Sequence, residues 1–289
     1  MPRDLPVREL ARRVWRETQK DQVTERAAAL SYYFLFALFP ALLFLIALLG
    51  YLPVTGLQER LMAYLREVMP PDAASTVERT VSEVLTTRRG GLLSIGALVA
   101  LWASSNGMVS IMTTMNAVCD VAERRAWWKR RLIALVLTFG FAIFIVAGLT
   151  LMVFGPLIGG AVANRFGFGT EFVAAWNVLR FPVVMVCVLL GIELVYYLAP
   201  AGRQGWRWIS PGATVALGAW LAMSYGLRLW VVNFGNYSAT YGSIGGVILL
   251  MLWLYLTSVV LLVGAEIDCE LDAAARGRAR VRRVEREAA

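Results

Sequence analysis

Residues 132–164 read LIALVLTFGFAIFIVAGLTLMVFGPLIGGAVAN, a stretch of 33 residues without a charged side chain. A helix needs about 20 apolar residues to cross the hydrocarbon core of a bilayer, so this stretch predicts one spanning helix and the start of a loop. Over all 289 residues, 58% are hydrophobic and 17% are charged, which is more apolar than an ordinary soluble domain. The sequence therefore predicts an integral membrane protein and excludes a cytosolic enzyme of two soluble domains.

The same pattern recurs five more times along the chain. Stretches with few or no charged residues occupy 27–58, 90–119, 181–201, 209–227 and 242–265. The sequence thus predicts an all-α, polytopic membrane domain over residues 27–265 with six transmembrane helices. Residues 1–26 lack the apolar core of a cleavable signal peptide, so we expect the first span to act as an uncleaved insertion signal.

The distribution of basic residues predicts the orientation. Of the 28 lysines and arginines, 20 lie in the two terminal segments and the even-numbered loops, and 8 lie in the other three connections. Because positive residues are enriched in cytoplasmic loops, both termini are predicted to be cytoplasmic. The net charge of +8 is thus mainly a topology and lipid-headgroup signal, and no nucleic-acid partner is expected.

Three segments are predicted outside the spans. The region 1–26 is expected to hold an amphipathic helix in the cytoplasmic membrane interface, because its apolar residues share one helical face. The region 57–90, broken at Pro70 and Pro71, predicts an external helical hairpin. The region 266–289 is predicted to be a charged cytoplasmic tail.

The second span carries the most polar side chains. Asn106, Ser110, Thr113 and Asn116 fall close to one side of the predicted helix. Polar groups in lipid need partners, so this polar stripe has to face other helices or a wet cavity. Two interpretations stay open: hydrogen bonding between helices or to the helix's own backbone, and the wall of a substrate path.

The start of the sixth span is rich in glycine. Tyr241, Gly242 and Gly245 belong to the sequence YGSIGG at 241–246. Glycines at this spacing allow helices to pack closely, and the alternative is an unwound helix entrance whose backbone faces a ligand. Together with the polar stripe, these residues are the candidates for a substrate path.

Two carboxylates complete the set of candidate residues. Glu193 is the one acid well inside a predicted span, and we consider either a coupling or substrate role or a hydrogen bond to Tyr196 or Tyr197. Glu266, at the inner end of the sixth span, is expected to form an anchoring ion pair with Arg125 or another arginine nearby.

Several kinds of chemistry are disfavoured by composition. The chain has no histidine, and its three cysteines are far apart with no C-x-x-C motif. We therefore expect no catalytic residues, no metal site and no cofactor, and we do not expect an enzyme. An intramembrane enzyme is the weakest alternative, because the sequence shows no catalytic nucleophile paired with a general base.

A set of short motifs resembles one family over most of the chain. They are RAAALSYYFLFALFP at 26–40, LWASS at 101–105, WW at 127–128, LAP at 198–200, PGA at 211–213, YGSIGG at 241–246, WLYL at 253–256 and GAE at 264–266. In this order they resemble the YihY/BrkB family of bacterial inner-membrane proteins. The resemblance implies a multi-pass protein of the inner (plasma) membrane, and some members carry old labels as a ribonuclease or a virulence factor. The ribonuclease label is disfavoured, because the metal-dependent enzymes of that type need histidine ligands.

The predicted function is transporter-like, or the translocation of a lipid or envelope component through the helical bundle. The alternative is a scaffold for envelope assembly that does not transport. The expected partners are membrane lipids, with a lipid or small-molecule substrate and envelope proteins as candidates.

Overall fold

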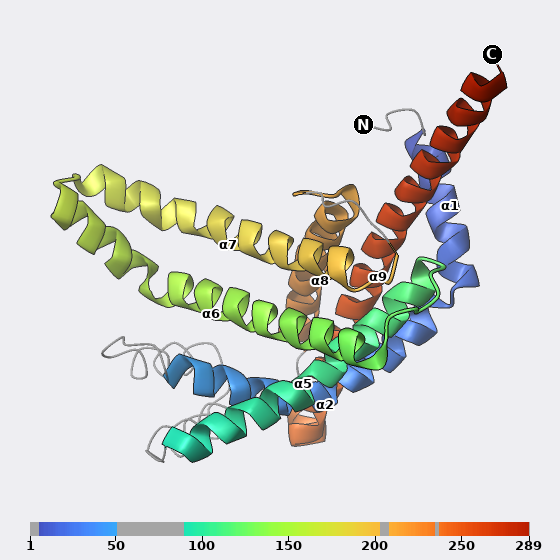
Figure 1. Cartoon of the computed structure of the whole chain (residues 1–289). Helices are drawn as coiled ribbons and strands as arrows, with labels where there is room; N and C mark the ends of the chain where they lie inside the picture. Colours follow the sequence, from blue (N-terminus) through green and yellow to red (C-terminus); the bar gives the residue numbers. More distant parts are fainter. Residues whose placement is uncertain (1–5, 51–89, 203–207, 235–236, 289) are drawn as a thin grey trace. The chain divides into compact units, whose positions relative to one another are not determined.

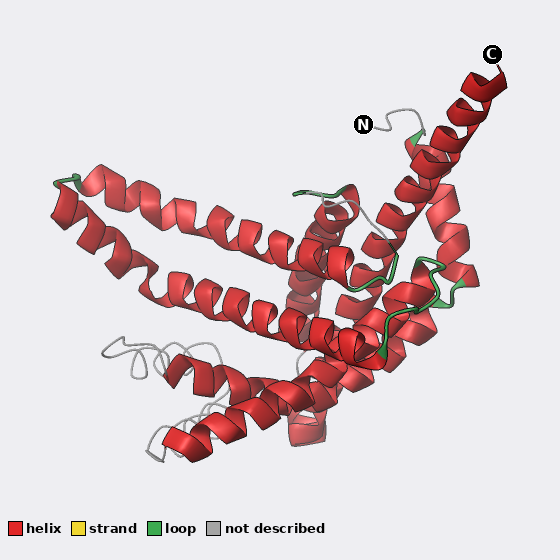
Figure 2. Ribbon diagram, in the orientation of Figure 1, coloured by secondary structure: helices red, strands yellow, loops and turns green. Residues whose placement is uncertain are grey.

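The computed structural model describes residues 6–50, 90–202, 208–234 and 237–288. Figure 1 and Figure 2 show that the regular elements of these residues are all α-helices, as predicted. They are α1 (Val7–Lys20), α2 (Val23–Gly50), α5 (Gly90–Val118), α6 (Trp127–Phe166), α7 (Thr170–Leu198), α8 (Pro211–Phe234) and α9 (Tyr237–Ala288).

Four helices of the described residues are long and apolar enough to cross a membrane. These candidate spans are Val23–Leu45 in α2, Trp127–Met152 in α6, Glu171–Leu198 in α7 and Gly245–Ala275 in α9. They correspond to four of the six predicted spans. The other two predicted spans fall on α5 and α8, which are helices of 29 and 24 residues. Neither is among the candidate spans of the described residues, so six spans are not confirmed.

The structure describes part of the segments predicted outside the spans. Residues Val7–Lys20 form the N-terminal helix α1, which packs against α9, and its place in the membrane interface stays a prediction. Helix α9 continues without a break to Ala288, so the charged tail is helical. The predicted external hairpin at 57–90 lies outside the described residues except for Gly90.

The chain divides into two compact units, each described by itself. Unit 1 comprises residues 1–37, 106–137 and 192–289, and unit 2 comprises residues 38–105 and 138–191. In unit 2, Phe44, Ala100 and Ala142 form a small buried cluster. In unit 1, the large side chains with almost no exposed surface include Leu30, Met112, Met115, Val195 and Leu262.

Unit 2 contains a close packing of α6 against α7. A Cβ added at Gly159 would overlap the ring of Trp176, whose Nε1 donates a hydrogen bond of 2.6 Å to the carbonyl of Gly155. Pro156 cannot donate to the carbonyl of Met152, four residues earlier, and Arg180 Nη1 lies 3.4 Å from that oxygen. Gly159 thus leaves space for the ring of Trp176, and the carbonyl oxygens of Gly155 and Met152 accept from Trp176 and Arg180 of α7.

Unit 1 contains the packing of α8 against α9, which lie side by side (Figure 1). A Cβ added at Gly264 would come within 2.8 Å of both the Ala216 Cβ and the Gly212 carbonyl oxygen. Small residues at such a contact let two helix backbones approach closely, which is how many membrane helices associate.

Large apolar side chains are exposed along the candidate spans. Examples are Phe36, Phe39, Val136, Ile143 and Val186, each more than a third exposed. On a soluble protein such surfaces would be a liability, but on helices that cross a membrane they are the surface that meets lipid.

Candidate functional site

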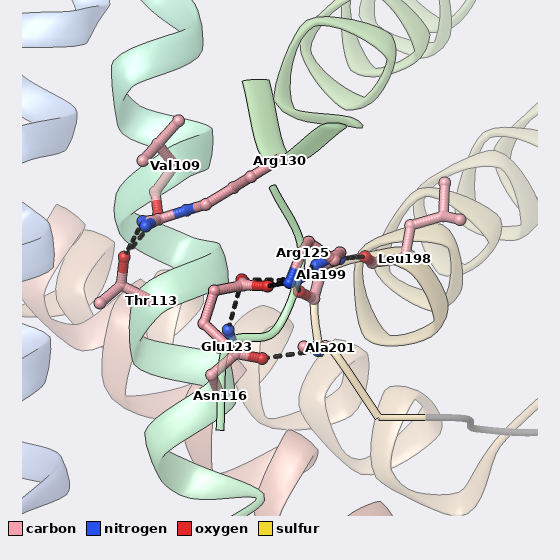
Figure 3. Close-up of polar contacts among 9 residues, drawn as sticks. All are labelled: Val109, Thr113, Asn116, Glu123, Arg125, Arg130, Leu198, Ala199 and Ala201. Carbon is pink, nitrogen blue, oxygen red and sulfur yellow. Dashed lines mark hydrogen bonds and ion pairs between the residues drawn. The ribbon is translucent and has the colours of Figure 1, made fainter. Parts of the chain in front are cut away.

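The start of α6 places two arginines on the polar stripe of α5. Arg131 Nη1 donates a hydrogen bond of 2.8 Å to Asn106 Oδ1. Arg130 Nη2 donates to Thr113 Oγ1 and, at 3.2 Å, to the carbonyl oxygen of Val109, as Figure 3 shows. We call these five residues the arginine site. It lies within unit 1 and joins two residues of the predicted path, Asn106 and Thr113, to two cations that the sequence analysis did not assign to it.

The hydroxyl groups of the stripe bond their own helix. Ser110 Oγ donates to the carbonyl of Asn106 at 3.1 Å, and Thr113 Oγ1 donates to the carbonyl of Val109 at 2.9 Å. Their protons are therefore used locally, and the oxygen lone pairs remain as acceptors. This explains why the stripe can hold guanidinium groups, which only donate.

Positive charge is concentrated around the arginine site. Among the described residues, Arg130 forms no ion pair with a carboxylate, and its hydrogen bonds go to neutral oxygens. Lys129 precedes it, with its Nζ 5.3 Å from the centre of the Trp128 ring. The N-terminus of α6 adds the positive end of a helix dipole. The start of the span is therefore strongly positive.

A second cluster joins the segment between α5 and α6 to the end of α7 (Figure 3). Arg125 Nε and Nη2 donate to the two oxygens of Glu123 at 2.9 and 3.0 Å. Arg125 also donates to the carbonyls of Leu198 and Ala199 at 3.0 and 2.7 Å, which satisfies acceptors that the end of a helix leaves open. The hydrogen bond from Arg125 holds the pKa of Glu123 at about 2, below its ordinary 4.5.

Asn116, the last residue of the predicted stripe, belongs to this second cluster. Its Nδ2 donates to Glu123 at 2.9 Å, and its Oδ1 accepts from the backbone N–H of Ala201 at 2.6 Å. Asn116 is buried, so these contacts give it an anchoring role. The expected ion pair of Arg125 with Glu266 is not formed, because Arg125 binds Glu123 instead.

The acid inside the fourth predicted span contacts the start of α8. Glu193 Oε2 accepts from the backbone N–H of Ser210 at 3.3 Å, and Asp268 Oδ1 accepts from that of Gly212 at 2.9 Å. Carboxylates at a helix N-terminus satisfy free N–H groups and interact favourably with the helix dipole. Tyr196, which we considered as a partner of Glu193, instead donates to the carbonyl of Leu261 at 2.6 Å.

Glu266 is placed differently from the other acids. The residue is 2% exposed, and its Oε2 has no hydrogen-bond partner in the part of the chain that the structure describes. Within the described residues, no lysine or arginine forms an ion pair with it. Arg26, another expected partner, donates its Nε to the carbonyl oxygen of Asp21 at 2.7 Å.

The glycine-rich start of the last span is helical. Tyr241, Gly242 and Gly245 all lie within α9, and Gly245 is buried. The backbone of these residues is helical. Their role in close packing or in a substrate path stays a prediction.

The comparison with protein families decides which family the chain belongs to. The model of the family described as "Virulence factor BrkB" matches residues 14–288. The chain belongs to the BrkB family. The resemblance seen in the motifs is thereby confirmed, and the protein is an integral membrane protein of this family.

Relatives of this BrkB-family chain carry two kinds of name. It is 37% identical to the ribonuclease-like protein YfkH of Bacillus subtilis (strain 168) over 246 residues. These matched residues cover 85% of this chain and 89% of that protein. It is 27% identical to a UPF0761 membrane protein of Alkalilimnicola ehrlichii and to one of Xanthomonas campestris pv. campestris. The chain spans only 55% and 60% of the length of those two proteins. No solved structure matches.

One contact in the BrkB-family chain was not foreseen in its sequence. Cys119, after α5, and Cys269, in α9, form a disulfide with a Cα–Cα distance of 5.4 Å. They are 150 residues apart, and no spacing motif connects them. Both lie at the end predicted to face the cytoplasm, where thiols are normally kept reduced, so the bond forms there only under oxidising conditions. Across the described segments, no group of three or more metal-ligating residues could hold a metal ion.

Proposed function

We propose that this BrkB-family protein translocates an anionic phospholipid across the bacterial inner membrane, and that the arginine site recognises the lipid phosphate. The observation that carries the proposal is the pair Arg130 and Arg131, held on neutral oxygens of α5 at the start of a candidate span. Both termini and the arginine site are assigned to the cytoplasmic side on the basis of the positive-inside rule.

The chemistry of the arginine site supports phosphate binding. Arginines at the cytoplasmic end of a membrane-spanning segment lie at the level of the lipid headgroups, where they can meet a lipid phosphate. Guanidinium groups bind phosphate through two parallel hydrogen bonds, and Arg130 keeps donors available because its described partners are not carboxylates. Trp127 and Trp128 are exposed beside the arginines, as tryptophans at a lipid headgroup layer are.

The other candidate residues receive more limited roles. Tyr241, Gly242 and Gly245 are kept as candidates for the outer end of the path, within the helical start of α9. Asn116 and Glu193 are assigned to anchoring, since each is held by backbone groups. No coupling role is proposed for Glu193.

The test is lipid translocation by the purified full chain in vesicles of phosphatidylcholine and phosphatidylglycerol. Flux is measured with fluorescent phosphatidylglycerol and, in parallel, with a fluorescent glycolipid that has no phosphate. We expect Arg130→Gln and Arg131→Gln to lower phosphatidylglycerol flux by about tenfold or more, because each removes a charge-assisted hydrogen bond. Lys129→Gln is the matched control, since it removes the same charge from the neighbouring residue without touching the stripe.

The outcomes separate this function from its alternative. Equal losses in all three variants would show a general effect of surface charge and overturn phosphate recognition by the arginine site. Flux no higher than in empty vesicles would overturn translocation and favour the scaffold for envelope assembly.

A further inference from the structure

Glu266 is a buried carboxyl group that forms no ion pair with the described residues, and its Oε2 accepts no hydrogen bond from them. It lies near the end of the candidate span Gly245–Ala275, is 2% exposed, and has no partner for its Oε2. An ionised carboxylate in such a place costs a large free energy unless a cation or donors compensate it. Glu266 therefore needs either a positive charge beside it or a bound proton that removes its negative charge.

Four carboxyl groups from different parts of the chain act electrostatically on Glu266. They are Glu17 of α1, Asp21 in the turn before α2, Asp120 just after α5, and Glu270 one turn further along α9. We call these four residues the acid cluster. Each of them disfavours a negative charge on Glu266.

The nearby cations are engaged with other groups. Lys20 Nζ lies 2.7 Å from Glu17 Oε2 and 3.5 Å from Asp120 Oδ2, and it is itself exposed. Arg26 is bound to the backbone carbonyl of Asp21. The pKa of Asp21 is raised, first by burial and then by Asp120, although Lys20 opposes this. Arg26 opposes the rise in the pKa of Asp21 as well, but the two cations do not reverse it.

We propose that Glu266 is a proton-binding site of this protein, supplied with protons from solvent through the acid cluster. A proton needs no coordination shell, which fits a place where the described residues offer no group able to hold a metal ion. In the binding step, a hydronium ion gives its proton to Oε2, an O–H bond forms on Glu266, and a water molecule is left. Release is the reverse. This site does not depend on the proposed lipid translocation.

The first test observes the bound proton directly by infrared spectroscopy of the full chain in lipid nanodiscs. A protonated carboxyl group gives a C=O band that a carboxylate lacks. We expect this band at neutral pH in the wild type and in Glu171→Gln, a control that removes an exposed carboxylate of α7 outside the acid cluster, and its loss in Glu266→Gln. Identical bands in wild type and Glu266→Gln would overturn the proposal.

A second test leaves Glu266 in place. Asp120→Asn removes one repelling charge from an exposed position, and asparagine tolerates the positive φ of 52° found there. With less repulsion, Glu266 ionises more easily, so its C=O band should disappear at a lower pH than in the wild type. If the pH dependence of the band is the same in Asp120→Asn and wild type, the acid cluster does not affect proton binding by Glu266, and that part of the proposal is wrong.

Discussion

At the scale of single residues, the donors around a carboxylate decide what it does. Glu193 and Asp268 accept hydrogen bonds from backbone N–H groups at the start of α8, and Glu123 accepts from Arg125 and Asn116. Glu266 is as buried as Glu193 but lacks such donors at its Oε2. A carboxyl group therefore serves as an anchor at Glu123, Glu193 and Asp268 and as the proposed proton site at Glu266.

Glu123 should make the stability of the protein depend on acid pH. Because its pKa is about 2 in the folded protein and about 4.5 ordinarily, its stabilising contribution is present above pH 4.5 and lost as the pH falls toward 2. We expect Glu123→Gln to lower the Tm near neutral pH and to make the fall of Tm below about pH 4.5 shallower. Glu9→Gln, which breaks the exposed Glu9–Arg13 pair, should leave the acid profile nearly unchanged. Equal acid profiles for Glu123→Gln and wild type would contradict this role.

At the scale of helices, glycine determines how closely α8 and α9 approach. A side chain at Gly264 would overlap the Tyr196 hydroxyl as well as Ala216 and the Gly212 backbone. Overlap with backbone cannot be relieved by a rotamer change, so the two helices would have to move apart. The hydrogen bonds of Gly212 to Asp268 and of Tyr196 to Leu261 cross the same region and fix the contact further.

Gly264→Ala should therefore destabilise unit 1. We expect a loss of about 1–3 kcal/mol in unfolding free energy, as is typical of overpacked sites. The matched control is Gly218→Ala in α8, where an added Cβ meets no atom within 4 Å. That change should be neutral or slightly stabilising, because alanine favours the helix. Thermal unfolding in detergent, followed by circular dichroism, measures both, and equal Tm values for the two variants would refute the packing argument.

At the scale of the whole molecule, the sequence was sufficient for the helices and the family but not for the contacts of the site. Long uncharged stretches predicted the four candidate spans because lipid selects for them directly. The polar stripe was visible from its spacing, but Arg130 and Arg131 were counted only as topology signals. Which donor meets which acceptor depends on how α5 and α6 pack, and no periodicity records that. The Cys119–Cys269 contact was missed for the same reason.

The predicted orientation can be tested by labelling. In a variant without Cys119, Cys187 and Cys269, a cysteine at Ala74 should react with an impermeant thiol reagent added outside intact cells, because the segment 57–90 is predicted to be external. A cysteine at Ala126, in the basic connection before α6, should react only after the cells are opened. The reverse pattern would invert the topology and place the arginine site on the outer side.

The link between Cys119 and Cys269 also bears on how the chain is made. It closes a covalent ring that contains α6, α7 and α8, since its two sulfur atoms are 150 residues apart. During synthesis, Cys119 leaves the ribosome long before Cys269, so the ring closes only after α9 has been inserted and has reached the end of α5. In an oxidised sample, ring closure therefore marks molecules whose assembly is finished. A ring and an open chain migrate differently on a non-reducing gel. The fraction of closed rings at successive times after synthesis would therefore measure how fast the protein assembles.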